Sequence, residues 1–135
     1  MSRSLLTFSA AFTGGVVGAI VNSAAMFGAV RYGVLHAMHV ALIPGFSLHW
    51  LYPRLVWGGL WGLSLTLPLG PRSIVARGLF WSLAPTLFQL LWVFPHQTPL
   101  GLFGLGAGVL TPLAILILNF IWGLAAAIWL SVSRG

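Results

Sequence analysis

Apolar residues fill four long stretches of this chain, and short segments rich in proline, glycine, histidine and arginine separate them. An α-helix needs about 20 apolar residues to cross roughly 30 Å of hydrocarbon, and each stretch has close to that length or more. The pattern predicts an all-α integral membrane protein with four transmembrane helices in a bundle, forming a single transmembrane domain over residues 1–135. The predicted helices cover about residues 4–30, 50–69, 73–94 and 106–132.

A shorter apolar segment lies between the first two predicted helices. It covers about residues 34–43 and is closed by Pro44 and Gly45. Since about ten residues are too few to cross the hydrocarbon layer, we expect a short interfacial or re-entrant helix here, on the outer side of the membrane.

Small residues gather on one face of several predicted helices. At about 100° per residue, Gly58 and Gly62 share one side of the second helix, and Gly14 and Gly18 share one side of the first. Gly123 takes a similar place on the fourth helix. Membrane helices associate through small residues that let backbones approach closely, because lipid gives apolar side chains no reason to associate. We therefore expect these glycines at helix–helix contacts.

Carboxamide side chains occur once in each of three predicted helices, as Asn22, Gln89 and Asn119. Each lies on the face that carries small residues, which we expect to point into the bundle. Amides at this depth either join helices through hydrogen bonds or form the polar lining of a path for a solute. The sequence leaves both interpretations open.

The composition limits the chemistry. With 59% hydrophobic and only 4% charged residues, the chain could not cover a soluble domain of this size. It has no Asp, Glu or Cys, so its side chains cannot form carboxylate acid–base pairs, carboxylate metal sites or thiolate centres. We therefore expect no enzyme and predict no catalytic residue and no metal site.

Arginines supply the formal charge of +6 and occur singly along the chain. Scattered in this way, they are typical of topology signals and lipid contacts, so we expect no nucleic acid as a partner. Arg31 and Arg54 belong to one side of the predicted bundle and the other four to the opposite side: Arg3, Arg72, Arg77 and Arg134. By the positive-inside rule this bias predicts both termini in the cytoplasm, in a cytoplasmic-type inner membrane, with Arg31 and Arg54 as outer-side positive residues.

Histidines gather on the predicted outer side. His36 and His39 are three residues apart, so on a helix they would share a face, and His49 lies nearby in the sequence. Such side chains either bind lipid headgroups and backbone or hold a haem, a pigment or a quinone. No cofactor is predicted, and cofactor binding through these histidines stays an alternative.

These features favour a non-catalytic accessory or structural subunit of a larger membrane complex, which packs through its small-residue helix faces. The first alternative is an oligomeric channel or carrier for a small neutral or anionic solute. The second is a haem-, pigment- or quinone-binding subunit that uses the outer-side histidines. The expected partners are membrane lipids and either other membrane subunits or further copies of the chain.

Overall fold

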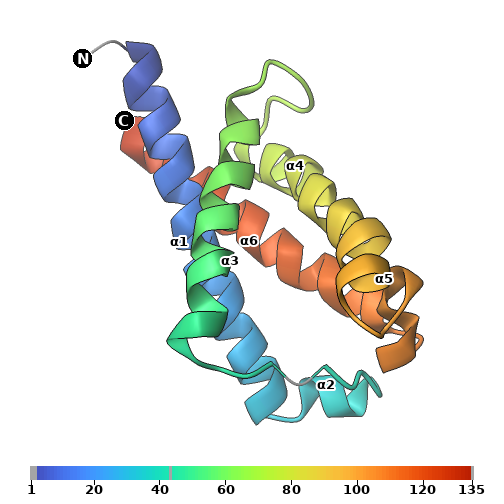
Figure 1. The fold of residues 1–135 in the computed structure, drawn as a ribbon. Helices are drawn as coiled ribbons and strands as arrows, with labels where there is room; N and C mark the ends of the chain where they lie inside the picture. Colours follow the sequence, from blue (N-terminus) through green and yellow to red (C-terminus); the bar gives the residue numbers. More distant parts are fainter. Residues whose placement is uncertain (1–2, 43, 135) are drawn as a thin grey trace.

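The computed structural model describes residues 3–42 and 44–134, and over these ranges the chain is helical with no strand (Figure 1). The elements of the first half are α1 (Arg3–Arg31), α2 (Val34–Ala37), α3 (Leu48–Gly62) and the 3₁₀-helix η1 (Leu63–Thr66). Those of the second half are α4 (Ile74–Phe88), the π-helix η2 (Gln89–Val93), α5 (Phe94–Gln97), the 3₁₀-helix η3 (Leu102–Ala107) and α6 (Thr111–Arg134).

Three helical segments are long and apolar enough to cross a membrane: Leu5–Arg31, Ile74–Gln97 and Thr111–Ser133. The chain thus has the helices of an integral membrane protein, as the sequence predicted. The α-helical part of α3 has only 15 residues, and η1 continues it without a break to Thr66. With a rise of about 1.5 Å per α-helical residue and about 2.0 Å per 3₁₀ residue, the two together run roughly 30 Å.

The ends of α3 and η1 follow from local side chains. Ser47 caps α3, because its hydroxyl accepts a hydrogen bond of 3.2 Å from the Trp50 amide. The helix therefore begins at Leu48, slightly earlier than predicted. The helical segment stops at Thr66 rather than at residue 69, since Leu67 precedes Pro68 and is extended.

Two other helix ends differ more from the prediction. The last helix begins at Thr111 rather than near residue 106, because residues 102–107 form 3₁₀ turns and Gly108, with φ of 143° and ψ of 156°, breaks the helical path before Thr111. The third predicted helix continues past residue 94 to Gln97. Pro95 lies just after the π-helical turn η2, where the helical hydrogen-bond pattern changes and the continuous helix tolerates its missing N–H.

Helix α2 covers four residues, fewer than the predicted 34–43, and Ile43 lies outside the described residues. His39 is left-handed, with φ of 57°, which ends α2. The His39 amide donates to the His36 carbonyl at 3.0 Å and the Val40 amide to the Leu35 carbonyl at 2.9 Å. These two bonds form a Schellman motif, which closes a helix C-terminus.

The helices pack in the order α3, α1, α6, α4. Helix α1 runs along both α3 and α6, and α6 also runs along α4, whereas α3 and α4 have no extended interface. Close approaches between α1 and α6 recur at four-residue steps, from Gly14 with Ala126 to Gly18 with Trp122. The two helices are therefore antiparallel, and the start of α1 and the end of α6 lie at the same end of the bundle (Figure 1).

Glycines allow these close approaches. A Cβ atom on Gly15 would overlap the Gly58 carbonyl of α3, and one on Gly123 would overlap the Gly78 carbonyl of α4. The structure buries all five glycines that the sequence assigned to helix packing, Gly14, Gly18, Gly58, Gly62 and Gly123, and each faces another helix of this chain. The small-residue faces are thus occupied within the chain itself.

One arginine fastens the connection between η1 and α4. The Arg77 guanidinium donates hydrogen bonds to the carbonyls of Leu65, Leu67, Leu69 and Pro71. Carbonyls at a helix end have no partner within the helix, and a cation there also interacts favourably with the helix dipole. Arg77 therefore holds the end of η1 against the start of α4.

Candidate functional site

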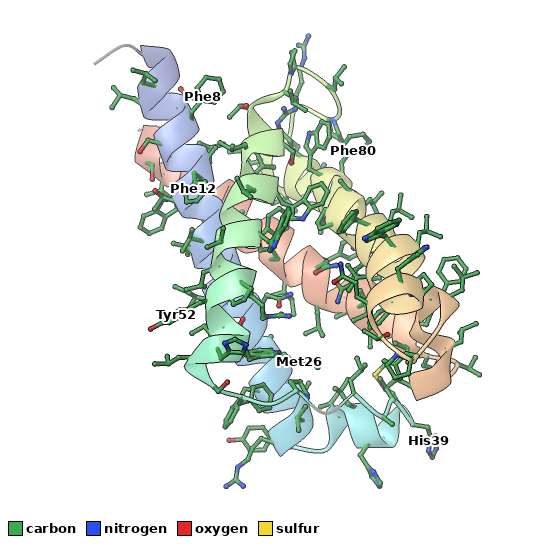
Figure 2. All side chains as sticks on the ribbon, viewed as in Figure 1. Phe8, Phe12, Met26, His39, Tyr52 and Phe80 are labelled. Carbon is green, nitrogen blue, oxygen red and sulfur yellow. The ribbon has the colours of Figure 1, made fainter. Side chains whose placement is uncertain are left out.

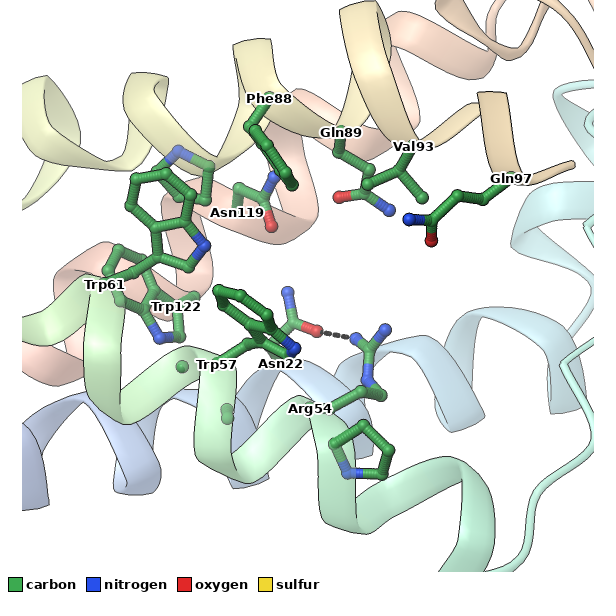
Figure 3. A pocket seen from close by; sticks show the side chains of 14 residues that line it. Asn22, Arg54, Trp57, Trp61, Phe88, Gln89, Val93, Gln97, Asn119 and Trp122 are labelled. Atoms are coloured by element: carbon green, nitrogen blue, oxygen red, sulfur yellow. Dashed lines mark hydrogen bonds between the residues drawn. The ribbon is translucent and has the colours of Figure 1, made fainter. Parts of the chain in front are cut away.

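Two cavities meet inside the bundle, and the same four polar residues line both of them: Asn22, Arg54, Gln89 and Asn119. We call these residues the polar belt. The first cavity has a volume of about 380 Å³ and lies between α3 and the α4–α5 segment; we call it the lateral cavity (Figure 3). The second has a volume of about 410 Å³ and extends to the connections α2–α3 and α5–η3; we call it the end cavity.

The belt residues come from four different helical segments but lie at one level. Each is about two helical turns inside the end of its segment, on the side of α2 and η3. Two turns correspond to about 11 Å along a helix.

Arg54 is the only charged side chain that lines these two cavities within the described part of the chain. It is partly buried and reaches from α3 to α1, where its Nε donates a hydrogen bond of 3.1 Å to Ser23 Oγ and its Nη2 donates to Asn22 Oδ1. Its guanidinium carbon also lies 4.5 Å from the centre of the Trp50 ring. These contacts hold the guanidinium inside the bundle, and Figure 3 shows the one with Asn22.

The two arginines that the sequence assigned to the outer side differ in exposure. Arg31 is exposed at the end of α1, as expected for a surface charge. Arg54 instead turns inward, because α3 begins at Leu48 and so places it in the second turn, next to the hydroxyl and amide of α1.

The Arg54 guanidinium keeps unused donors. Of its five N–H groups, one on Nε and one on Nη2 are bonded, and no acceptor among the described residues takes the other three. No side chain of the chain is a carboxylate, so none can neutralise the charge. Holding an unpaired charge in a medium of low dielectric costs roughly several kcal/mol of free energy. An anion from outside the chain would lower this cost.

Two of the three amides also tie helices together. Asn22 Nδ2 donates a hydrogen bond of 2.7 Å to the Leu118 carbonyl of α6. Asn119 Nδ2 donates one of 2.9 Å to Thr86 Oγ1 of α4. Gln89 makes no side-chain hydrogen bond to the described residues, and its amide points into the cavity beside that of Gln97 (Figure 3). The interhelical bonding that the sequence allowed thus applies to the asparagines, while Gln89 is free to bind a solute.

A π-helical turn aims one row of side chains at the lateral cavity. Pro85, Gln89, Val93 and Gln97 are four residues apart and all line it. In a regular α-helix each step of four would rotate the row by about 40°. The wider turn of η2, in which the Phe94 amide donates to the Gln89 carbonyl, offsets part of this drift. Sequence reasoning missed both the π-turn and Gln97, and the one available signal was a pair of prolines, Pro85 and Pro95, in a single apolar stretch.

Aromatic side chains from three helices also line the lateral cavity. Trp57 and Trp61 come from α3, Phe88 from α4 and Trp122 from α6. Trp122 is buried and fixed, since its Nε1 donates 3.0 Å to the Gly15 carbonyl of α1. The rings of Trp61 and Phe88 lie 5.7 Å apart and bridge the two walls of the cavity.

The histidines lie away from this site. His36, His39 and His49 are exposed, and none of them lines either cavity. His39 points away from the bundle (Figure 2). The expectation that His36 and His39 share a helical face is wrong, because the left-handed backbone at His39 ends α2. Within the described ranges no three histidines, cysteines or acids are grouped as metal ligands would be.

No known protein family matches the chain, and no similar curated protein or solved structure was found. The cavities and the polar belt therefore carry the functional argument.

Proposed function

We propose that this protein is a non-catalytic membrane carrier or channel that binds an anionic solute at the polar belt. The observation that supports this most is the Arg54 guanidinium, which faces both cavities with free N–H donors in a chain without acidic side chains. Charge-assisted hydrogen bonds from a guanidinium to an anion are among the stronger polar contacts in proteins. Gln89 and Gln97 add amide donors beside it.

The proposal includes four membrane crossings, with α3 and η1 together as the fourth. Helix α1 is one of the three apolar spans, and α3 lies antiparallel along it from Ser23 opposite Arg54 to Ala11 opposite Gly62. A segment of roughly 30 Å that runs beside a spanning helix fits the same hydrocarbon layer. Four crossings put both termini on one side.

The arginine distribution supports a cytoplasmic position for the termini. Arg3, Arg72, Arg77 and Arg134 fall at the end of the bundle that carries the termini, and the exposed Arg31 falls at the other. Since Arg54 turns into the bundle, the charge bias between the two surfaces is stronger than the sequence alone suggested. We therefore propose a cytoplasmic-type inner membrane with both termini inside.

An accessory role in a larger membrane complex is the second proposal. The small-residue faces that first favoured it are used within the chain, so they no longer require a partner. Arg54 still supports it, since a carboxylate from a neighbouring subunit would satisfy the free N–H groups as a solute would. Purification in mild detergent separates the two proposals, because only the accessory role requires a companion chain at a fixed ratio.

Binding measurements test the carrier proposal. The protein in zwitterionic nanodiscs is titrated with sodium phosphate and sodium benzoate at constant ionic strength, and tryptophan fluorescence is followed because Trp50 lies against Arg54. We expect saturable binding that Arg54→Met weakens about tenfold or more and that the control Arg31→Met leaves unchanged, since Arg31 is exposed outside the cavities. The proposal is refuted if neither of these anions and no anionic amphiphile binds in a way that depends on Arg54.

A further inference from the structure

We infer that the anion is the headgroup of an amphiphile: a carboxylate or phosphate bound at Arg54, carried on a long apolar chain that lies in the lateral cavity and leaves the bundle between α3 and α4. This inference rests on the proposed function and names its ligand class. Three features of the cavities support it: where the lateral cavity opens, how its lining divides, and where the end cavity leads.

The lateral cavity opens on the side of the bundle. Its two walls, α3 and α4, have no extended interface, whereas every other pair of neighbouring long helices is closely packed. Trp57 and Phe88 line the opening and are 56% and 40% exposed. The side of a membrane bundle faces acyl chains. An apolar chain can therefore enter between α3 and α4 directly from the bilayer, where a water-soluble ion cannot.

The lining of the lateral cavity divides into a polar and an apolar part. Arg54 and the amides of the belt stand at one end, and indole, phenyl and proline rings form most of the remainder: Pro53, Trp57, Trp61, Pro85, Phe88 and Trp122. A purely hydrophilic ion would leave these rings without an apolar partner, and a purely apolar molecule would leave the guanidinium unpaired. A ligand with an oxyanion at one end and hydrocarbon at the other matches both parts.

The guanidinium suits an oxyanion in particular. Both N–H groups of Nη1 and one of Nη2 are free, so two neighbouring donors can meet two oxygens of one carboxylate or phosphate. Guanidinium is also weakly hydrated, which lowers the cost of binding an anion away from water. The contacts with Ser23 and Asn22 hold it in place before a ligand arrives.

The end cavity gives the headgroup room beyond the polar belt. It runs from the belt to the connections at the helix ends, where Pro44 and Thr98 line it. Water and the outer part of a large headgroup can therefore occupy the roughly 11 Å between Arg54 and the helix ends. The two cavities share the belt, so a headgroup at Arg54 contacts both while its chain lies in the lateral cavity.

The test uses the 135-residue protein in phosphatidylcholine nanodiscs and four kinds of probe: oleate, dioleoyl phosphatidic acid, uncharged oleyl alcohol, and the small anions acetate and inorganic phosphate. Binding is measured by native mass spectrometry and by tryptophan quenching with dibrominated oleate, whose bromines quench only indoles they contact. We expect at least one charged amphiphile to bind about tenfold or more tightly than any of the other probes, with quenching of the cavity tryptophans.

Variants separate headgroup from chain. Arg54→Met should reduce amphiphile binding about tenfold or more, Arg54→Lys less, and Arg31→Met not at all. Phe88→Ala removes an aromatic ring from the apolar part of the lateral cavity and should reduce amphiphile binding while small anions still bind. Thermal unfolding in detergent shows whether each variant is folded. If Arg54→Met does not fold, the comparison is made with Arg54→Lys.

The outcomes are distinct. Tighter binding of oleate assigns the site to carboxylates, and tighter binding of phosphatidic acid assigns it to phosphates; either result supports the inference. If acetate or phosphate binds in an Arg54-dependent way and no amphiphile does, the inference is wrong and the proposed function stands. If oleyl alcohol binds as tightly as oleate and Arg54→Met changes neither, the cavity holds lipid chains without recognising an anion, and both fail.

Discussion

Helix α3 has two neighbours, and its contacts with them are opposite in kind. Toward α1 it presents Gly58 and Gly62, and the two backbones touch. Toward α4 it presents Trp57 and Trp61, and the backbones stay apart with a cavity of about 380 Å³ between them. Both faces belong to one short sequence, WGGLWG. Small side chains close one interface and large ones keep the other open, so the cavity is a consequence of side-chain size rather than a packing defect.

The largest expected effect comes from breaking the closed interface. Gly15→Leu should prevent the bundle from folding, since the new Cβ overlaps the backbone of Gly58 and neither helix can give way without losing the whole interface. Gly28→Leu, also on α1, is the matched control, because open space surrounds Gly28. Monodispersity and thermal unfolding in detergent check this. Equal stability of both variants would mean that α1 and α3 are not packed as described.

A second pair of variants compares two tryptophans that line the lateral cavity: Trp122, which is buried and bonded to α1, and Trp57, which is exposed. Trp122→Ala should cost about 2 kcal/mol or more of unfolding free energy, because it leaves a void between α1 and α6 and removes the hydrogen bond to Gly15. This is below the roughly 3–5 kcal/mol seen in soluble cores, since lipid supplies no hydrophobic transfer term. Trp57→Ala should change stability little and weaken ligand binding instead. The reverse ranking in unfolding assays would contradict these roles of the two tryptophans.

The amides of the belt give a smaller contrast. Asn22→Leu should destabilise the protein by about 1–2 kcal/mol, because it breaks the bond to Leu118 and removes an acceptor from Arg54. Gln89→Leu removes no side-chain bond to the described residues, so it should leave stability unchanged and lower anion binding. In a double-mutant cycle Asn22→Leu and Arg54→Met should be less than additive, and strict additivity would show that the two side chains do not interact.

The smallest expected effect concerns the interface of α4 with α6. Thr86→Val keeps the shape of the side chain and removes the hydroxyl that accepts from Asn119, which should cost about 0.6 kcal/mol, the average for such bonds in membranes. Thr13→Val on the exposed side of α1 is the control and should cost nothing measurable. If both variants unfold alike under steric trapping or mild denaturant, the Asn119 bond does not contribute to stability.

The sequence by itself determined the class of the fold and the residues available for contact. Its apolar runs predicted the helices, because hydrocarbon admits only segments that satisfy their own backbone, and three of them are long and apolar enough to span. Its periodicity also put the glycines on common faces, since helical geometry is local. The inward position of Asn22, Gln89 and Asn119 followed from the same geometry, while their role in binding stays a prediction.

Only the tertiary structure decided which of these faces closed and which stayed open. The inward turn of Arg54 depends on Ser23 and Asn22 of another helix, and the row from Pro85 to Gln97 depends on a π-turn that no local periodicity indicates. Likewise, the left-handed backbone at His39 ends α2, so His36 and His39 do not share a helical face. Each of these features is set by what a side chain meets across the bundle or by a single backbone angle, and hydrophobic periodicity along one helix contains neither.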